Sequence, residues 1–192
     1  MATKRKPSGD AGKVASTAAT AAANGAAKIS AEVLDAPTGT GQLDALKRLR
    51  IVIRAAQRHS SWVEKQCGVS GAQLWVMQEL LEQPGLRVGE LAAKLAIHQT
   101  TTSNLVEALV KKSYVLKARD QRDQRVVTLM LSEQGQKMIA DAPKPARGLL
   151  PEALGKLDTR GLAALNKGLQ ALLDVIEQVD DGFGMQPLPF TM

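Results

Sequence analysis

A run of small polar side chains opens one of the amphipathic helices that the sequence predicts. It reads Gln-Thr-Thr-Thr-Ser-Asn, and the apolar positions of the same helix begin only at Leu105. Amides and hydroxyls at a helix start can bond to base edges, and threonine methyl groups can meet the thymine methyl. An ordinary solvated helix start has the same composition, so this run alone leaves both interpretations open. The residues concerned are Gln99, Thr100, Thr101, Thr102, Ser103 and Asn104.

A charged segment follows between two apolar runs, residues 115–119 and 126–131. It reads Asp-Gln-Arg-Asp-Gln-Arg, and six polar residues between two strand-like runs predict a hairpin loop. Arginine is favoured where a narrow minor groove concentrates negative potential, and Asp120 and Asp123 can pair with the arginines and orient them. A self-paired surface loop is the alternative. Helix start and hairpin together favour DNA binding. The basic residues concerned are Lys117, Arg119, Arg122 and Arg125.

The charge distribution agrees with a polyanionic partner. The formal net charge is +6 and the sequence pI is about 9.6. Residues 86–131 hold 8 basic and 4 acidic side chains, so the most basic segment is internal and contains both polar clusters. A concentrated positive field raises the encounter rate with nucleic acid.

Other classes of protein lack support in the sequence. There is no Gly-rich phosphate loop, nucleophile elbow or His-rich motif, so we expect no enzyme, no cofactor and no metal site. No apolar run is long enough for a bilayer, and the N-terminus lacks a signal-peptide core. The single cysteine, Cys67, allows no intrachain disulfide, which favours a cytoplasmic protein. We expect Cys67 to be structural or incidental rather than a redox sensor.

Hydrophobic spacing predicts a mainly α-helical fold with a small β-hairpin. Residues 1–41 have the composition of a disordered basic tail rich in alanine, and residues 182–192 that of a second tail rich in glycine and proline. The helix predicted from Ser132 contains Pro143 and Pro145, so we expect it to kink there. The expected elements are helices over 42–67, 71–83, 88–95 and 99–112, strands over 115–119 and 126–131, and helices from 132 and from 158.

The last predicted helix has an apolar seam with alternating intervals of three and four residues. Such a heptad-like seam favours packing against a partner helix. We expect a homodimer, because the seam offers more apolar surface than one helix hides easily; packing within the subunit is the alternative. The expected interface residues are Leu43, Leu46, Leu162, Leu165, Leu169, Leu172, Ile176 and Val179.

Residues 70–135 resemble the MarR family of winged helix-turn-helix regulators. The matching segments, in family order, are Leu-Ala-Ala-Lys-Leu at 91–95, Thr-Thr-Ser-Asn-Leu-Val at 101–106, the Asp-x-Arg-Asp-x-Arg loop at 120–125 and Leu-Ser-Glu-Gln-Gly at 131–135. The resemblance is weaker over residues 43–180. One departure is Ser113, where the family commonly has glycine.

The resemblance implies a winged helix-turn-helix over 70–131, flanked by dimerisation helices over 42–67 and 132–181, within one domain over 42–181. Residues 99–104 would begin the recognition helix, Arg122 and Arg125 would be the wing arginines, and Asp123 would brace the wing. Family members often bind small aromatic or phenolic effectors. Two rings and a cation suit an aromatic carboxylate, although both tryptophans can equally be core residues. The candidate ligand residues are Arg54, His59, Trp62, Gln73 and Trp75.

We therefore expect a homodimeric, ligand-responsive repressor that binds double-stranded DNA at an inverted-repeat operator. Palindromic operators need two half-sites about one helical turn apart, which also favours the dimer. A nonspecific architectural DNA-binding protein is one alternative, and it predicts steep salt dependence without sequence preference. A winged-helix module for protein interaction is the other, and it leaves the wing arginines dispensable.

Overall fold

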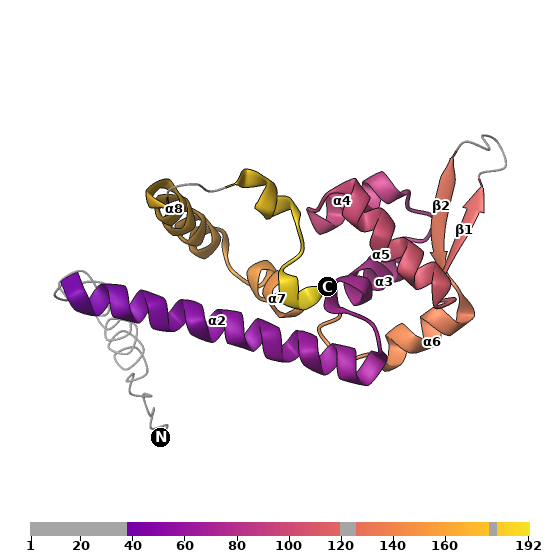
Figure 1. Ribbon diagram of the computed structural model, residues 1–192, viewed down its shortest axis with the longest axis horizontal. Coiled ribbons are helices and arrows are strands. Elements are labelled where there is room, and N and C mark those ends of the chain that lie inside the picture. Colours follow the sequence, from indigo (N-terminus) through magenta and orange to yellow (C-terminus); the bar gives the residue numbers. More distant parts are fainter. Residues whose placement is uncertain (1–37, 120–125, 177–179) are drawn as a thin grey trace, which may run out of the picture. The chain divides into compact units, whose positions relative to one another are not determined.

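The computed structural model describes residues 38–119, 126–176 and 180–192. The chain divides into two compact units, residues 1–50 and 51–192. The described part of the first unit is the exposed beginning of helix α2 (Thr38–Cys67). The fold below is that of the second unit, which contains the rest of α2 and every later element (Figure 1). The predicted disorder of residues 1–37 lies outside the described residues, whereas residues 38–41, also predicted as tail, are helical.

Two cap signals set the boundary between α2 and the next helix, α3 (Gly71–Glu82). Gly68, with φ of 64°, takes the left-handed conformation that commonly follows a helix end. Ser70 then starts α3 with a reciprocal capping box: its hydroxyl accepts from the Gln73 amide and the Gln73 side chain accepts from the Ser70 amide. The helix predicted from residue 71 therefore begins at the expected residue.

Helices α4 (Val88–Leu95) and α5 (Gln99–Lys111) form the helix-turn-helix pair. The turn between them depends on Ala96, whose φ of 53° lies in the left-handed region. Ile97 donates its amide to the Ala92 carbonyl (3.2 Å) and buries its side chain, which fixes the direction of the chain into α5.

Strands β1 (Val115–Arg119) and β2 (Val127–Leu131) form an antiparallel pair with Val115 opposite Leu131 and Arg119 opposite Val127. Gly85 donates its amide to Leu129 (2.8 Å), which joins the loop after α3 to the base of the hairpin. Ser113, just before β1, has φ of 60°. The left-handed region favours glycine, which gives a physical reason for the family preference at this position.

The segment after the hairpin differs from the predicted kinked helix. Helix α6 (Glu133–Asp141), capped by Ser132, ends before Pro143, and a separate short helix α7 (Leu149–Gly155) follows. Two prolines close together cannot supply the backbone donors that a continuous helix needs, so the helix stops rather than bends. The last helix, α8 (Thr159–Val175), starts where predicted and is capped by Asp158. Two short 3-10 turns follow, η1 (Asp181–Met185) and η2 (Pro189–Thr191).

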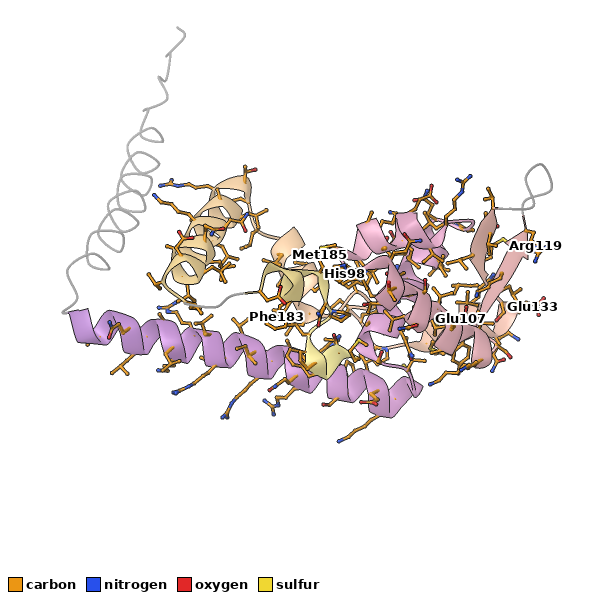
Figure 2. The ribbon with its side chains drawn as sticks, turned by 45° about the horizontal axis from the view of Figure 1, so that its top comes forward. His98, Glu107, Arg119, Glu133, Phe183 and Met185 are labelled. Atoms are coloured by element: carbon orange, nitrogen blue, oxygen red, sulfur yellow. The ribbon has the colours of Figure 1, made fainter. Side chains whose placement is uncertain are left out.

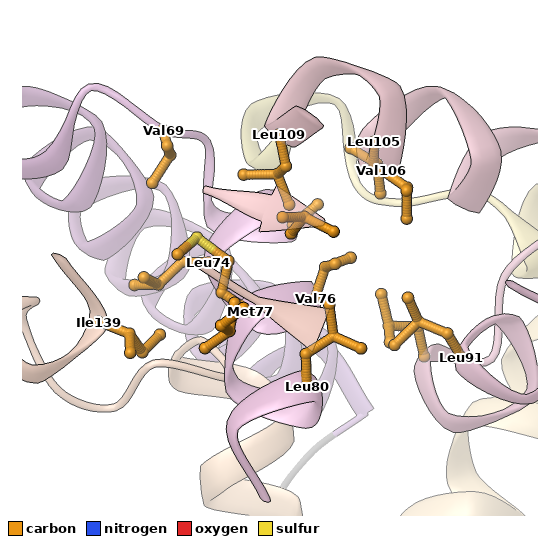
Figure 3. Close-up of a cluster of buried hydrophobic side chains, with 14 of the residues drawn as sticks. Val69, Leu74, Val76, Met77, Leu80, Leu91, Leu105, Val106, Leu109 and Ile139 are labelled. Carbon is orange, nitrogen blue, oxygen red and sulfur yellow. The ribbon is translucent and has the colours of Figure 1, made fainter. Parts of the chain in front are cut away.

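The hydrophobic core lies around α3, which contacts α4, α5, α6 and β2 (Figure 3). Leu74, Val76, Met77 and Leu80 from α3 are at most 1% exposed and meet residues of the surrounding elements. Because aromatic residues make up only 3% of the chain, aliphatic side chains fill this core. The helix-turn-helix and the hairpin therefore share one packed support. Within the described residues, no helix is long and apolar enough to cross a membrane.

Candidate nucleic-acid interface and adjoining cavity

The first turn of α5 presents most of the polar residues that the sequence singled out. Gln99, Thr100 and Asn104 are exposed, and Thr101 and Ser103 are half-buried. The opposite side of the helix buries Leu105, Val106 and Leu109 in the core. Core packing thus orients α5 so that amide and hydroxyl groups face outward, which is the chemistry that base-edge recognition needs.

Thr102 departs from the prediction for this group. Its side chain is fully buried, and its hydroxyl donates to the carbonyl of His98 at 3.1 Å. The hydroxyl satisfies a backbone acceptor inside the first turn and its methyl group faces the core. Thr102 therefore holds the helix start in place and has no free polar group to offer DNA.

The base of the hairpin is attached to α5 by an ion pair between Lys117 and Glu107. Both side chains are at least 37% exposed, so the pair orients the groups more than it stabilises the fold. Arg119, at the end of β1, is exposed (Figure 2). The predicted roles of Arg122, Asp123 and Arg125 fall on residues outside those the structure describes.

A buried carboxylate supports the helix-turn-helix from behind. Glu79 of α3 is 4% exposed; it accepts from the Arg147 Nε (2.7 Å) and the Trp75 Nε1 (3.0 Å), and pairs with Lys94 of α4 (3.4 Å). Burial raises the pKa of Glu79, but the hydrogen bonds from Arg147, Trp75 and Lys94 outweigh it, and the net shift is downward. Glu79 is thus held ionised as a link between α3, α4 and the segment before α7.

A cavity of about 380 Å³ adjoins this network. Its wall combines the second half of α2, the start of α3, the turn between α4 and α5, the α7 region and the C-terminal segment. The wall is mostly apolar. Its polar members are His59, Ser60, Trp75, Arg147, Gln186 and Thr191.

The five predicted ligand residues do not share one site. His59 and Trp75 line the cavity, and His59 Nε2 lies 3.1 Å from the Pro145 carbonyl oxygen. Arg54 and Trp62 line a separate shallow groove on α2, together with Lys65. Gln73 is engaged in the capping box of α3. The helical spacing of α2 places Arg54 and Trp62 on the groove and Ala56 and Val63 in the cavity wall. The rings of His59 and Trp62 still meet edge to face, with their centroids 5.9 Å apart.

Two contributors to the site are not predictable from the sequence. Arg147 lies in the proline-rich segment after α6, and only its contacts with Glu79 and Glu82 reveal its position. The C-terminal segment was predicted as a tail, yet six of its residues line the cavity. A single basic residue in a loop and a Gly/Pro-rich end carry no periodicity from which such contacts can be predicted.

Three further predicted features have plain structural descriptions. The apolar seam of α8 is exposed, with Leu162 at 36% and Leu169 at 42%, and α8 has no buried residue; Val179 lies outside the described residues. Cys67 is half-buried, and burial raises the pKa of its thiol, which disfavours the reactive thiolate. Among the described side chains, no cluster of histidine, cysteine and carboxylate groups is arranged to hold a metal ion.

Comparisons with known proteins agree with this geometry. Residues 58–142 match the family model described as transcriptional regulator SarA/Rot. The chain is 24% identical over 129 residues to the uncharacterised HTH-type transcriptional regulator YsmB of Bacillus subtilis, covering 67% of this chain and 88% of YsmB. It is 30% identical over 73 residues to the HTH-type transcriptional repressor MdtR of the same organism, covering 38% and 46%.

A solved structure supports the same fold. The crystal structure of a MepR-like protein complexed with pseudoligands superposes with a TM-score of 0.50 at 20% identity, covering 67% of this chain and 92% of that protein. The predicted fold class, mainly helical with a two-stranded wing, is confirmed.

Proposed function

We propose that the chain is a helix-turn-helix transcription regulator of the MarR/SarA type, and that it is a repressor that binds an inverted-repeat DNA operator as a homodimer. The observation that carries the proposal is the polar first turn of α5, held outward by a buried apolar face and tied to the hairpin through Lys117 and Glu107. A recognition helix enters the major groove with such a turn first. By the resemblance, one of the two wing arginines, Arg122 or Arg125, enters the adjacent minor groove in this proposal.

The dimer in this proposal uses the exposed seam of α8. A row of leucines at 36–42% exposure is costly in water, and two such rows facing each other remove it from solvent. A second copy also supplies the second half-site that an inverted repeat requires.

The test is selection of genomic fragments with the purified chain at about physiological salt. We expect enrichment of one short inverted repeat, and loss of that enrichment in the variant Arg122→Ala/Arg125→Ala. The matched control is Arg160→Ala/Lys167→Ala, which removes two positive charges from exposed positions of α8 and should keep the enrichment. Binding without sequence preference would favour the architectural alternative, and equal loss in both variants would mean that net charge alone drives binding.

We also propose that the cavity binds a neutral aromatic or phenolic effector. Arg147 is the cationic guanidinium in the wall, and its charge is already matched by Glu79 and Glu82. A carboxylate ligand would therefore enter an apolar cavity without a free counter-ion, and its desolvation would be expensive. The aromatic carboxylate favoured by the grouping of Arg54 with the tryptophans lacks this support, since Arg54 faces the other groove.

Calorimetric titration with 2-naphthol and 2-naphthoate separates the two ligand chemistries, because the rings are the same and only the charge differs. We expect heat of binding from 2-naphthol and at least about tenfold weaker binding of 2-naphthoate. Tighter binding of the carboxylate would contradict the neutral-ligand proposal.

A further inference from the structure

The C-terminal segment Asp180–Met192 is built into the regulator rather than left as a free end. The Asp180 carboxylate accepts from the Gly182 amide (2.8 Å) and caps the turn η1. Pro187 restricts the backbone before η2, and Pro189 is the first residue of that turn. The segment ends beside the start of α3, where a Cβ atom placed on Gly71 would lie 3.7 Å from the Thr191 Cβ (Figure 1). It thus has defined contacts at both of its ends.

One contact reaches the start of the recognition helix. The carbonyl oxygen of Met185 accepts a hydrogen bond of 2.9 Å from the backbone N–H of His98, the N-cap residue of α5 (Figure 2). The first N–H groups of a helix have no partner within the helix. Such groups are among those that contact DNA phosphates. In this structure the His98 N–H is therefore already bonded to the Met185 carbonyl of the same chain.

The same segment forms one wall of the cavity. The residues that it contributes to the wall are Gly184, Gln186, Pro187, Leu188, Phe190 and Thr191. The cavity is also lined by Leu95, Ala96 and Ile97, which lead into α5. A molecule in the cavity would touch both the C-terminal segment and these residues.

We propose that residues 180–192 form an autoinhibitory strap, in which the Met185 carbonyl competes with a DNA backbone phosphate for the His98 N–H. A neutral ligand that fills the cavity packs against the strap and stabilises its docked position, which weakens DNA binding. Ligand and DNA are then coupled through one two-state element. This inference rests on the proposed function, because the competitor for the amide is DNA.

The test compares the parent chain with two variants. The first is a deletion of residues 180–192. The second is the substitution Phe190→Asp, which places a charge in the apolar cavity wall and should undock the strap without shortening the chain. The matched control is Phe183→Asp, the same substitution at a side chain that is 66% exposed. Two quantities are measured: the amide exchange rate of His98 by nuclear magnetic resonance without DNA, and the Kd for the selected operator fragment with and without 2-naphthol.

We expect faster His98 exchange and a roughly three- to tenfold lower Kd in the deletion and in Phe190→Asp, with neither change in Phe183→Asp. In the deletion, 2-naphthol should no longer weaken DNA binding. Unchanged His98 exchange, or faster exchange with an equal or higher Kd for a selectively bound operator, overturns the strap alone. If no version of the chain binds any DNA selectively, the proposed function fails as well.

Discussion

At the scale of single residues, Glu79 shows how a buried charge is matched by several hydrogen-bond donors. Its carboxylate has partners from three segments, Trp75 on its own helix, Lys94 on α4 and Arg147 before α7. These donors compensate the buried charge of Glu79. If the carboxylate were removed, the positive charges of Arg147 and Lys94 would lose their counter-charge. Glu79 therefore fixes the position of α4, and with it the turn into α5.

Replacing Glu79 with glutamine should lower the free energy of unfolding by about 2 kcal/mol at neutral pH, because Arg147 and Lys94 lose their counter-charge. Urea denaturation measures this change. The control Glu64→Gln alters an exposed carboxylate of α2 and should stay within about 0.5 kcal/mol of the parent. Equal effects of the two substitutions would contradict the role of Glu79.

The pH dependence of stability follows from the lowered pKa of Glu79. A carboxyl group whose folded pKa lies below its unfolded value, about 4.3, stabilises the fold above that value and loses the contribution as pH falls through the folded pKa. The parent chain should therefore lose stability below about pH 4.3 more steeply than Glu79→Gln. Parallel stability curves for the two proteins, measured by urea titration at a series of pH values, would contradict this assignment.

At the scale of elements, the sequence predicts a helix start best where a side chain can cap the helix. Ser70, Ser132 and Asp158 cap helices where expected, and the alternating residues of the hairpin pair as strands. The prediction of one kinked helix from Ser132 is wrong. Two prolines can either kink or end a helix, and tertiary contacts decide between the two. The side chains of α2 were grouped by proximity in sequence, whereas helical periodicity distributes them between two faces.

The junction of α6 with the hairpin depends on the absence of a side chain at Gly135. A Cβ atom placed there would lie 2.2 Å from the carbonyl oxygen of Tyr114, a backbone atom that cannot move without shifting β1. Gly135→Ala should therefore destabilise the protein by about 2–3 kcal/mol, despite the higher helix propensity of alanine. Chemical denaturation gives the value.

Gly89 of α4 provides the opposite case. A Cβ atom there meets only the Gln99 side-chain oxygen, at 3.9 Å, which is ordinary contact. Gly89→Ala should stabilise the protein by up to about 1 kcal/mol. If both glycine substitutions stabilised the protein, helix propensity rather than steric contact would govern the α6 junction.

At the scale of the whole molecule, the exposed apolar seam and the docked C-terminal segment follow different rules. The seam of α8 can be predicted from the sequence because its period is regular. In the single chain the seam is exposed, and no described residue buries it. The C-terminal segment is irregular, so its place in the cavity wall emerges only from the three-dimensional structure. Periodic features are thus predictable from sequence, and irregular contacts between distant segments are not.

The seam carries the last prediction, that self-association depends on α8. Leu169→Asp puts a charge into the middle of the seam, and in a two-fold dimer the substitution occurs twice at the same interface. Burial of one leucine contributes about 1.5–3 kcal/mol, so the dimer dissociation constant should rise by roughly a hundredfold or more. Ala171→Asp introduces the same charge on the opposite side of α8 and should leave the constant nearly unchanged. Sedimentation velocity over a concentration series measures both. Equal association of the two variants would mean that the seam packs elsewhere, and a parent chain that stays monomeric at micromolar concentration would remove the dimer from the proposed mechanism.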